Sequence, residues 1–304
     1  MTAAPLIANG IPKSGTYFLD SIVRTTGHWQ RTGLHMAKPH SVIRHEDGST
    51  ETIPRPALDV IPTIAAGTYT NAHMSWDAEI EASLLANKVK HVLIYRDPRD
   101  TIVSMMRWQT YNPNFVTSDA ERQRQTELQL GFANDRDRIR HFILLMRWND
   151  YSDYSPWLKS PACHAVRFED IYREITSGEA EMPTVRRLYD YLEVTLQPEE
   201  LRACLHNSVT SSGEKSKIGA WRQFFGAEEL ALLEYPQFKQ SMSALGYRLH
   251  SPAITKTETY RNEEGALLLR EYWDTSHPDC PKHMRDLNPR PTVYIRAEPV
   301  SEEQ

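Results

Sequence analysis

Short apolar runs alternate along most of the chain with segments in which apolar residues recur at helical spacing. Strand patterns occur at residues 5–11, 63–73, 91–96 and 162–168, and those at 5–11 and 91–96 are apolar runs. The helical spacing predicts helices at 16–26, 77–88, 98–109, 183–193, 198–206 and 227–245, and residues 118–154 also have a helical pattern. Strands that alternate with helices favour a parallel sheet covered by helices on both faces. The pattern therefore predicts an α/β fold.

Two stretches fall outside this alternation. Asp47-Gly48 lies between the short segments 41–44 and 51–53, and this arrangement predicts a small hairpin beside the sheet. Residues 251–304 contain many prolines, a helical pattern near 262–273 and a strand pattern at 292–296. We therefore expect one main domain over residues 1–250 and a C-terminal extension over residues 251–304.

The first predicted strand passes directly into Pro12-Lys13-Ser14-Gly15-Thr16 at the start of the first predicted helix. Such a turn directs backbone N–H groups and the positive helix end to one place, where Lys13 and Thr16 add side-chain donors. The P-loop spacing G-x-x-x-x-G-K-[ST] is absent, which disfavours an ordinary ATP or GTP site. The turn predicts an anion site, with an exposed lysine at a plain strand-to-helix corner as the alternative.

A second anion site is predicted where the strand at 91–96 ends. Arg96-Asp97-Pro98-Arg99-Asp100 follows there, and Pro98 suits the first turn of the next helix. Arg96 at the strand end and Ser104 in that helix can converge on one phosphate, because both side chains donate hydrogen bonds. Two strand ends therefore each offer an anion site.

Three segments occur in the order of one family's motifs. Residues 12–16 read P-K-S-G-T, Arg96 precedes Ser104 by eight residues, and residues 214–221 keep the Lys, the second Gly and the Trp of R-K-G-x-x-G-x-W. In these motifs, spanning roughly residues 5–248, the chain resembles the sulfotransferases that use 3′-phosphoadenosine 5′-phosphosulfate (PAPS). The resemblance implies a P-loop-like three-layer fold with a central parallel sheet. It also implies PAPS as co-substrate, 3′,5′-adenosine bisphosphate (PAP) as product, and no metal.

The resemblance further implies a set of donor-binding residues: Lys13, Ser14, Gly15, Thr16, Tyr17, Phe18, Arg96, Ser104, Lys215, Ser216 and Lys217. Phe18 would stack on adenine, with ordinary helix packing as the alternative. Glu214, Ser216 and Asn71 stand where the family has Arg, Gly and Lys. Affinity for the 3′-phosphate would therefore rest more on Arg96, Ser104, Lys215 and Lys217.

The resemblance also implies the catalytic residues. Lys13 would stabilise charge on the departing bisphosphate. His73 lies in Thr70-Asn71-Ala72-His73, at nearly the separation from Arg96 that the family's K-T-H histidine has, and would be the general base. The alternative for His73 is a hydrogen-bonded histidine at a strand end.

Composition agrees with a cytoplasmic enzyme. The formal net charge of −5 gives no global attraction to nucleic acid or to an anionic membrane, so neither is an expected partner. The three cysteines are widely spaced, which suits a reducing compartment. No apolar run is long enough to cross a bilayer.

The acceptor is less well defined. We expect a hydroxyl, or an amine, of a small molecule or glycan. Trp76 and Tyr111 are weak candidates for contact with it, although aromatic residues are more often buried in packing. The extension 251–304 is expected on or near the acceptor cleft. The family's dimer motif is not matched at Arg222, Gly226, Ala227 and Ala231, which leaves the oligomeric state open.

Two other functions remain open at this point. One is a catalytically inactive nucleotide-binding or regulatory protein of the same fold. The other is a small-molecule kinase, which is disfavoured by the missing P-loop spacing and by the absence of an evident Mg²⁺-binding carboxylate after an apolar strand. His277-x-x-Cys280-x-x-His283 resembles part of a metal site, but it lacks a clear fourth ligand and a solvated loop is favoured.

Overall fold

The computed structural model describes residues 2–37, 41–44, 50–53, 56–116, 118–146, 151–177, 181–195, 198–199, 201–202, 218–249, 254–261, 267–274 and 293–299. The chain forms two compact units. We call Met1–Met105 with Tyr151–Gly219 the sheet unit, and Met106–Asp150 with Ala220–Gln304 the second unit. The predicted boundary at residue 250 falls inside the second unit, and the place expected for residues 251–304 stays a prediction. Within the described ranges, no helix is long and apolar enough to cross a bilayer.

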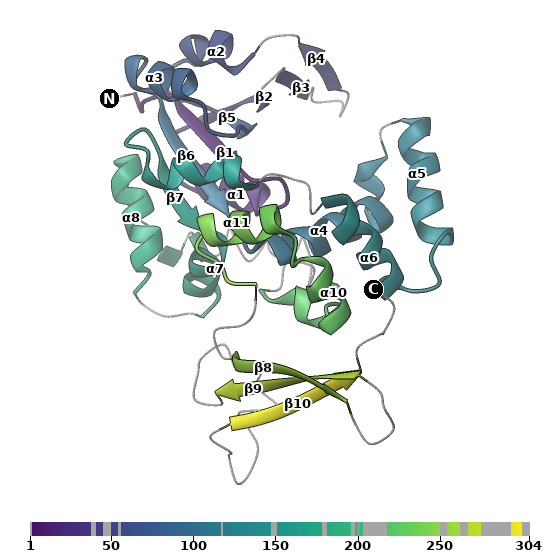
Figure 1. The fold of residues 1–304 in the computed structure, drawn as a ribbon. Coiled ribbons are helices and arrows are strands. Elements are labelled where there is room, and N and C mark those ends of the chain that lie inside the picture. The colour runs from purple at the N-terminus through teal and green to yellow at the C-terminus, as the bar shows by residue number, and fades with distance from the viewer. Residues whose placement is uncertain are drawn as a thin grey trace. The chain divides into compact units, whose positions relative to one another are not determined.

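The sheet unit contains a seven-stranded sheet with the order β4-β3-β2-β5-β1-β6-β7 (Figure 1). Its strands are β1 (Leu6–Gly10), β2 (Gln30–Ala37), β3 (Ser41–Arg44), β4 (Thr50–Ile53), β5 (Thr68–His73), β6 (Lys90–Tyr95) and β7 (His164–Arg167). The five strands from β2 to β7 in this order pair in parallel, and β3 pairs antiparallel with both β2 and β4. The predicted parallel sheet and the predicted hairpin are both confirmed.

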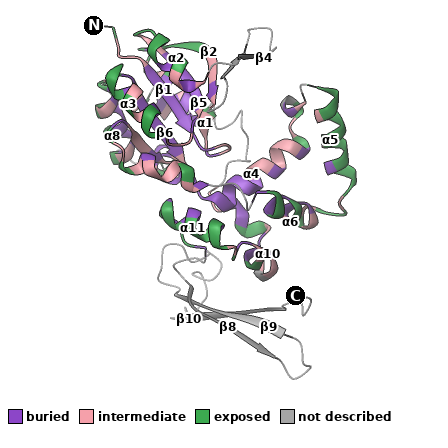
Figure 2. Ribbon diagram, turned by 45° about the horizontal axis from the view of Figure 1, so that its top comes forward, coloured by how far each residue is buried: buried purple, intermediate pink, exposed green. Residues whose placement is uncertain are grey.

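Helices cover both faces of this sheet. They are α1 (Thr16–Thr25), α2 (Ala57–Val60), η1 (Ile61–Thr63), α3 (Ala78–Ala86), η3 (Tyr151–Lys159), α7 (Phe168–Thr176) and α8 (Pro183–Leu192). Successive residues of a strand point to opposite faces. Leu6 and Ala8 of β1 accordingly pack in one apolar cluster with α1, α7 and α8, whereas Ile7 packs in another with α2, α3 and η3. Figure 2 shows the central strands buried between these helices, and the predicted three-layer arrangement is confirmed.

Some elements differ from those that the pattern predicts. β2 was not expected, because Gln30, Arg31 and Thr32 are exposed and give no apolar alternation. Phe168 begins α7 and does not end a strand, since the acidic residues after it favour the start of a helix. Residues 198–199 and 201–202 are helical, in part of the predicted helix at 198–206.

The second unit contains further helices and a small sheet. α4 (Pro98–Tyr111) begins in the sheet unit and ends here, and it is followed by η2 (Pro113–Phe115), α5 (Asp119–Leu130), α6 (Asp135–Met146), η5 (Ala220–Gln223), α10 (Ala227–Leu232) and α11 (Pro236–Ala244). The predicted helix at 227–245 is thus divided, and Pro236 begins its second half.

The C-terminal residues form an antiparallel sheet with the order β10-β9-β8. Its strands are β8 (Ile254–Arg261), β9 (Leu267–Asp274) and β10 (Val293–Pro299). The helix predicted near 262–273 is therefore wrong, because β9 pairs along its length with strands on both sides, and such pairing outweighs local helical spacing. The predicted terminal strand is confirmed.

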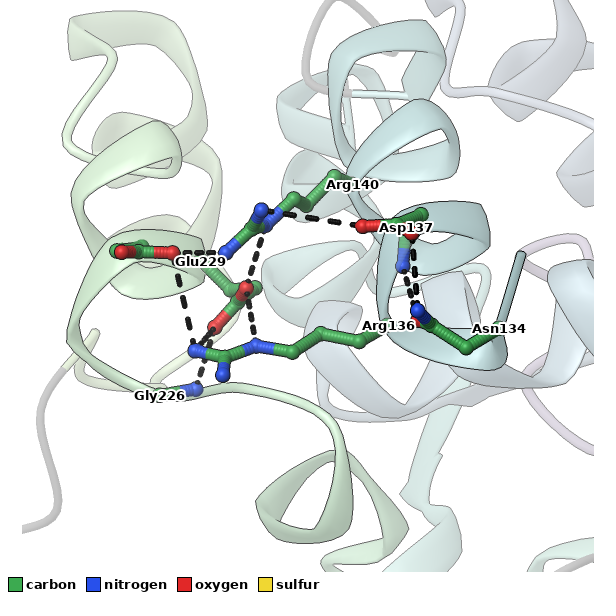
Figure 3. A network of polar contacts seen from close by, with 7 residues as sticks. Asn134, Arg136, Asp137, Arg140, Gly226 and Glu229 are labelled. Carbon is green, nitrogen blue, oxygen red and sulfur yellow. Dashed lines mark hydrogen bonds and ion pairs between the residues drawn. The ribbon is translucent and has the colours of Figure 1, made fainter. Parts of the chain in front are cut away.

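A network of charged residues joins α6 to α10 within the second unit (Figure 3). Glu229 is fully buried and accepts hydrogen bonds from Arg136, Arg140 and the backbone N–H of Gly226. Burial acts to raise the pKa of Glu229, but these hydrogen bonds outweigh it and hold the pKa below its ordinary value. A buried carboxylate needs such partners, so this network fixes α10 on α6.

Candidate active site

The candidate site lies at the carboxyl end of β1, in the middle of the sheet. β1 pairs with β5 on one side and β6 on the other, and all three run in the same direction. Their carboxyl ends therefore meet at one edge, where the connections of a parallel α/β sheet leave room for a ligand. The loop of residues 11–15 that contains Lys13 joins β1 to α1 at this edge. We call it the Lys13 loop.

The Lys13 loop has an unusual backbone that its hydrogen bonds support. Lys13 has a φ of 66° and Gly15 a φ of 109°, both in the left-handed region. The Ser14 N–H donates to the Ile11 carbonyl at 2.9 Å, and the Ser14 hydroxyl donates to the Ile94 carbonyl on β6 at 2.8 Å. Ser14 is completely buried, so its side chain anchors the loop to the sheet. Its predicted contact with the donor remains a prediction.

The start of α1 leaves hydrogen-bonding groups for a ligand. Gly15 is the N-cap and has no side chain to satisfy the N–H groups of the first turn. The hydroxyl of Thr16 is buried and has no hydrogen-bond partner among the described residues. At Gly10, a Cβ would lie 2.6 Å from that hydroxyl oxygen. A glycine at position 10 thus keeps open the space beside Thr16, and these groups fit an anion such as a phosphate.

Replacing Gly15 with alanine is expected to destabilise the protein by about 2–4 kcal/mol, because two costs add. A Cβ at Gly15 would lie 2.6 Å from the ring of Phe168, which is buried and cannot move aside, and the left-handed φ is strained for alanine. Urea unfolding would measure the loss. Gly27→Ala is the matched control, since Gly27 has a φ of 66° with nothing near its Cβ position. Equal losses in the two variants would rule out the contact with Phe168 as a cause.

Two cationic side chains act on each other at this edge. Burial, together with the positive charge of Arg96, lowers the pKa of Lys13 to about 8. A lysine is held near such a charge only at a cost, which a bound anion would remove. Lys13 and Arg96, predicted from separate motifs, are thus electrostatically coupled, as expected of two groups that bind one multiply charged ligand.

The second motif is held together by Asp100. Arg96 is buried at the end of β6, and its guanidinium lies 3.3 Å from the Asp100 carboxylate and 4.6 Å from the centre of the Phe168 ring. The same Asp100 carboxylate accepts the Gly219 N–H at 2.8 Å. Gly219 belongs to the third motif, so Asp100 connects the second and third motifs. Ser104 lies half-buried in the second turn of α4.

His73 lies at the end of β5, beside the Lys13 loop. Its Nδ1 is 2.5 Å from the Gly10 carbonyl oxygen, and its ring meets that of His35 on β2 with the centres 4.6 Å apart. Burial lowers the pKa of His73, and the charge of Lys13 lowers it further against the opposite effect of the Gly10 hydrogen bond. The lowered pKa favours the neutral form of the ring, which is the form that a general base needs.

The other residues predicted to bind the donor differ in their exposure to solvent. Tyr17 is exposed, whereas Phe18 is buried, with its ring centre 5.5 Å from that of Phe168 and 5.9 Å from that of Tyr172. These contacts favour the packing alternative for Phe18. Lys215, Ser216 and Lys217 lie outside the described residues.

The two weak acceptor candidates belong to different units. Trp76 is half-buried in the sheet unit and donates from Nε1 to Glu81. Tyr111, in the second unit, donates to Asp135 and accepts from Arg138. The structure gives each of them protein partners, and their contact with an acceptor stays a prediction.

Sequence reasoning missed three residues that support the site. Asp100 follows Arg96 by four positions and lies in the first turn of α4, a placement that could have indicated their ion pair. Phe168 contacts both Gly15 and Arg96, but it comes from a distant segment and no local pattern indicates this. The third, Asn9, is buried and bonds to the backbone beside His73.

Comparisons with known proteins bear on this site. Residues 5–218 match the model of the sulfotransferase domain family. Among solved structures, mouse sulfotransferase SULT7A1 complexed with PAP is similar, with 12% identity, a TM-score of 0.46, and coverage of 79% of this chain and 85% of that one. Retinol dehydratase in a complex with retinol and PAP is also similar, with 13% identity, a TM-score of 0.43, and coverage of 83% and 84%. No curated protein matches in sequence. The family match covers most of the chain, together with the Lys13 loop, His73 and Arg96, and the chain belongs to the sulfotransferase domain family.

Proposed function

We propose that this protein transfers a sulfuryl group from PAPS to a hydroxyl, or an amine, of a small-molecule or glycan acceptor. The observation that carries the proposal is the arrangement at the carboxyl edge of the sheet: the Lys13 loop follows β1, His73 ends β5 with its Nδ1 2.5 Å from the Gly10 carbonyl oxygen, and Arg96 follows β6. This arrangement puts two cations and a neutral base together. Such groups suit the transfer of an anionic group to a neutral nucleophile, because the cations stabilise the negative charge of the donor and the base accepts the proton of the nucleophile.

The chain's own groups fit the donor. The unpartnered Thr16 hydroxyl, the first N–H groups of α1 and the ammonium of Lys13 suit the 5′-phosphosulfate, because all of them donate hydrogen bonds. Arg96 and Ser104 would bind the 3′-phosphate. Lys215 and Lys217 would add positive charge there. Fixing both ends of the donor would hold the sulfur at one point relative to the acceptor.

Lys13 would act on the leaving group. When the bond between sulfur and the bridging oxygen breaks, its electron pair stays on the 5′-phosphate of PAP. The Lys13 ammonium would stabilise this charge by donating a hydrogen bond to that oxygen, and it does so best in a site with little water. Binding of the anionic donor would also raise the pKa of Lys13 and keep it protonated.

His73 would act on the acceptor. The Gly10 carbonyl can only accept a hydrogen bond, so the neutral ring of His73 carries its proton on Nδ1 and leaves Nε2 as the acceptor. As the acceptor oxygen forms its bond to sulfur, its proton would pass to Nε2 of His73. The Gly10 carbonyl would then stabilise the resulting imidazolium through the same hydrogen bond.

A binding experiment tests the donor site directly. By titration calorimetry, PAP is expected to bind more tightly than ADP or ATP with Mg²⁺. Arg96→Ala is expected to weaken PAP binding by about tenfold to a hundredfold, as the loss of a charged hydrogen bond predicts. Because Arg96 is buried, Ser104→Ala serves as a milder second variant. Ser21→Ala, on the exposed side of α1, is the control.

The outcomes separate the alternatives. Preference for ATP with Mg²⁺ would favour a kinase and overturn the proposal. Tight PAP binding without transfer of labelled sulfate to any acceptor in a broad panel of phenols, alcohols, amines and sugars would favour a nucleotide-binding protein that has lost catalysis.

A further inference from the structure

The backbone pairing between β1 and β5 ends just before the candidate base. Its register runs from Leu6 opposite Tyr69 to Asn9 opposite Ala72. The next residue, Gly10, is in register with Ile94 of β6 and no longer with β5. The two strands therefore separate at the site, and backbone pairing does not fix His73 against Gly10.

The side chain of Asn9 continues this pairing where the backbone stops. Its Oδ1 accepts the N–H groups of Gly10 and Met74, and its Nδ2 donates to the Met74 carbonyl, each over 2.9 Å. The Asn9 side chain is completely buried. A side-chain amide has the same kinds of donor and acceptor as a peptide group. The side chain of Asn9 therefore connects β1 to the end of β5 where the backbone hydrogen bonds between the two strands stop.

These hydrogen bonds hold the backbone on both sides of the contact between His73 and Gly10. Gly10, which accepts from His73 through its carbonyl, is held through its N–H by Asn9. Met74, which follows His73, is held by Asn9 through both of its backbone groups. The Met74 carbonyl also accepts from Nε1 of Trp157 at 3.2 Å. Both sides of the His73 contact are thus attached to one buried side chain.

We propose that Asn9 is a positioning residue that holds the ring of His73 in register with the Lys13 loop. This inference rests on the proposed role of His73 as general base. Aspartate cannot replace Asn9 in this role, because it has no N–H group to donate to the Met74 carbonyl. Alanine can form none of the three hydrogen bonds. The buried N–H of Met74 would then lose its acceptor.

The pKa of His73 can be used to detect a change in the position of its ring. The charged or titratable groups that face it are Lys13 and His35, and burial is the main cause of its lowered pKa. If Asn9 holds the ring in place, its removal lets water reach the ring and moves the pKa of His73 up toward the ordinary value. A base must be neutral, so the acidic limb of the kcat profile would move to higher pH.

The experiment compares Asn9→Ala and Asn9→Ser with wild type. We expect kcat to fall about tenfold to a hundredfold and the acidic limb to move to higher pH, because misplacing a reacting group by a small distance is costly. NMR titration of the His73 ring should show the same shift in the free protein, whether or not the protein turns out to transfer sulfate. Failure of the proposed function and failure of this inference are therefore distinguishable.

The matched control is Thr70→Val. Thr70 is equally buried, lies on β5 three residues before His73, and donates one hydrogen bond to the Leu34 carbonyl on β2. Its loss should lower stability without moving the pH profile. An unchanged His73 titration in both Asn9 variants would overturn the proposal. If neither variant folds, two NMR measurements on the wild type test the proposal instead. A neutral His73 ring that carries its proton on Nε2, or rapid hydrogen exchange of the Met74 N–H, would overturn the proposal as well.

Discussion

His73→Asn is expected to lower kcat by about a hundredfold to ten-thousandfold, the range typical of the loss of a general base. Asparagine is the informative replacement, since its amide can still donate to the Gly10 carbonyl that Nδ1 of His73 contacts at 2.5 Å. The local structure is thus preserved, but no group remains to accept the acceptor's proton. PAP affinity should change by less than about threefold, because His73 is not among the proposed donor-binding groups.

The pH profile gives this prediction a second test. In wild type, the acidic limb should lie below the ordinary histidine value, because burial and the charge of Lys13 lower the pKa of His73. His73→Asn should lack this limb. His164→Asn is the control, since His164 is a partly buried histidine on β7 that stacks on Tyr191. If His73→Asn retains nearly full activity, His73 is not the base.

Lys13→Met is expected to lower kcat by about a hundredfold to a thousandfold, as found when one preorganised donor to a developing charge is removed. Methionine keeps the unbranched chain and removes the ammonium. PAP binding should weaken too, because the charge also acts in the bound product. Lys239→Met, which removes one exposed cation paired with Glu234, is the control for net charge. Activity that survives Lys13→Met would exclude the proposed leaving-group role.

Lys13 also predicts a basic limb in the wild-type profile. Its pKa in the free protein is about 8, so kcat/KM should decline as pH rises through that value and the ammonium loses its proton. In the complex the donor's charge raises this pKa, and kcat should therefore decline only at higher pH. Lys13→Met should show neither decline.

The sequence predicts the centre of this protein better than its edges. β1 and β6 are apolar runs that end in polar motifs, and a buried parallel strand has this pattern. The strand predicted at 63–73 is shorter in the structure, where η1 ends at Thr63 and β5 begins at Thr68. β2 has no strand pattern in the sequence, because its first three residues are exposed and its place depends on pairing with β5. The local spacing at β9 predicts a helix, but pairing with β8 and β10 determines its conformation.

The sequence likewise predicts some residues of the candidate site and misses others. Lys13 and Arg96 could be predicted, because each lies in a motif at a strand end. Asn9 could not, since one polar residue inside an apolar strand has no partner that the sequence reveals. Its partner Met74 is 65 positions away and is brought there only by the parallel pairing of β1 with β5.

The central position of β1 also has a consequence for synthesis of the chain on the ribosome. Leu6–Gly10 is completely buried in the finished sheet, but both of its neighbours are made later, and β6 ends about 85 residues further on. At typical rates of translation, roughly 4 to 17 s pass before the second neighbour exists. A parallel pair cannot close as a hairpin, so β1 has no early substitute for these neighbours. The nascent chain therefore carries this apolar strand without its partners from the time it leaves the ribosome until β6 has emerged, and chaperones that bind such segments should associate with it over that period.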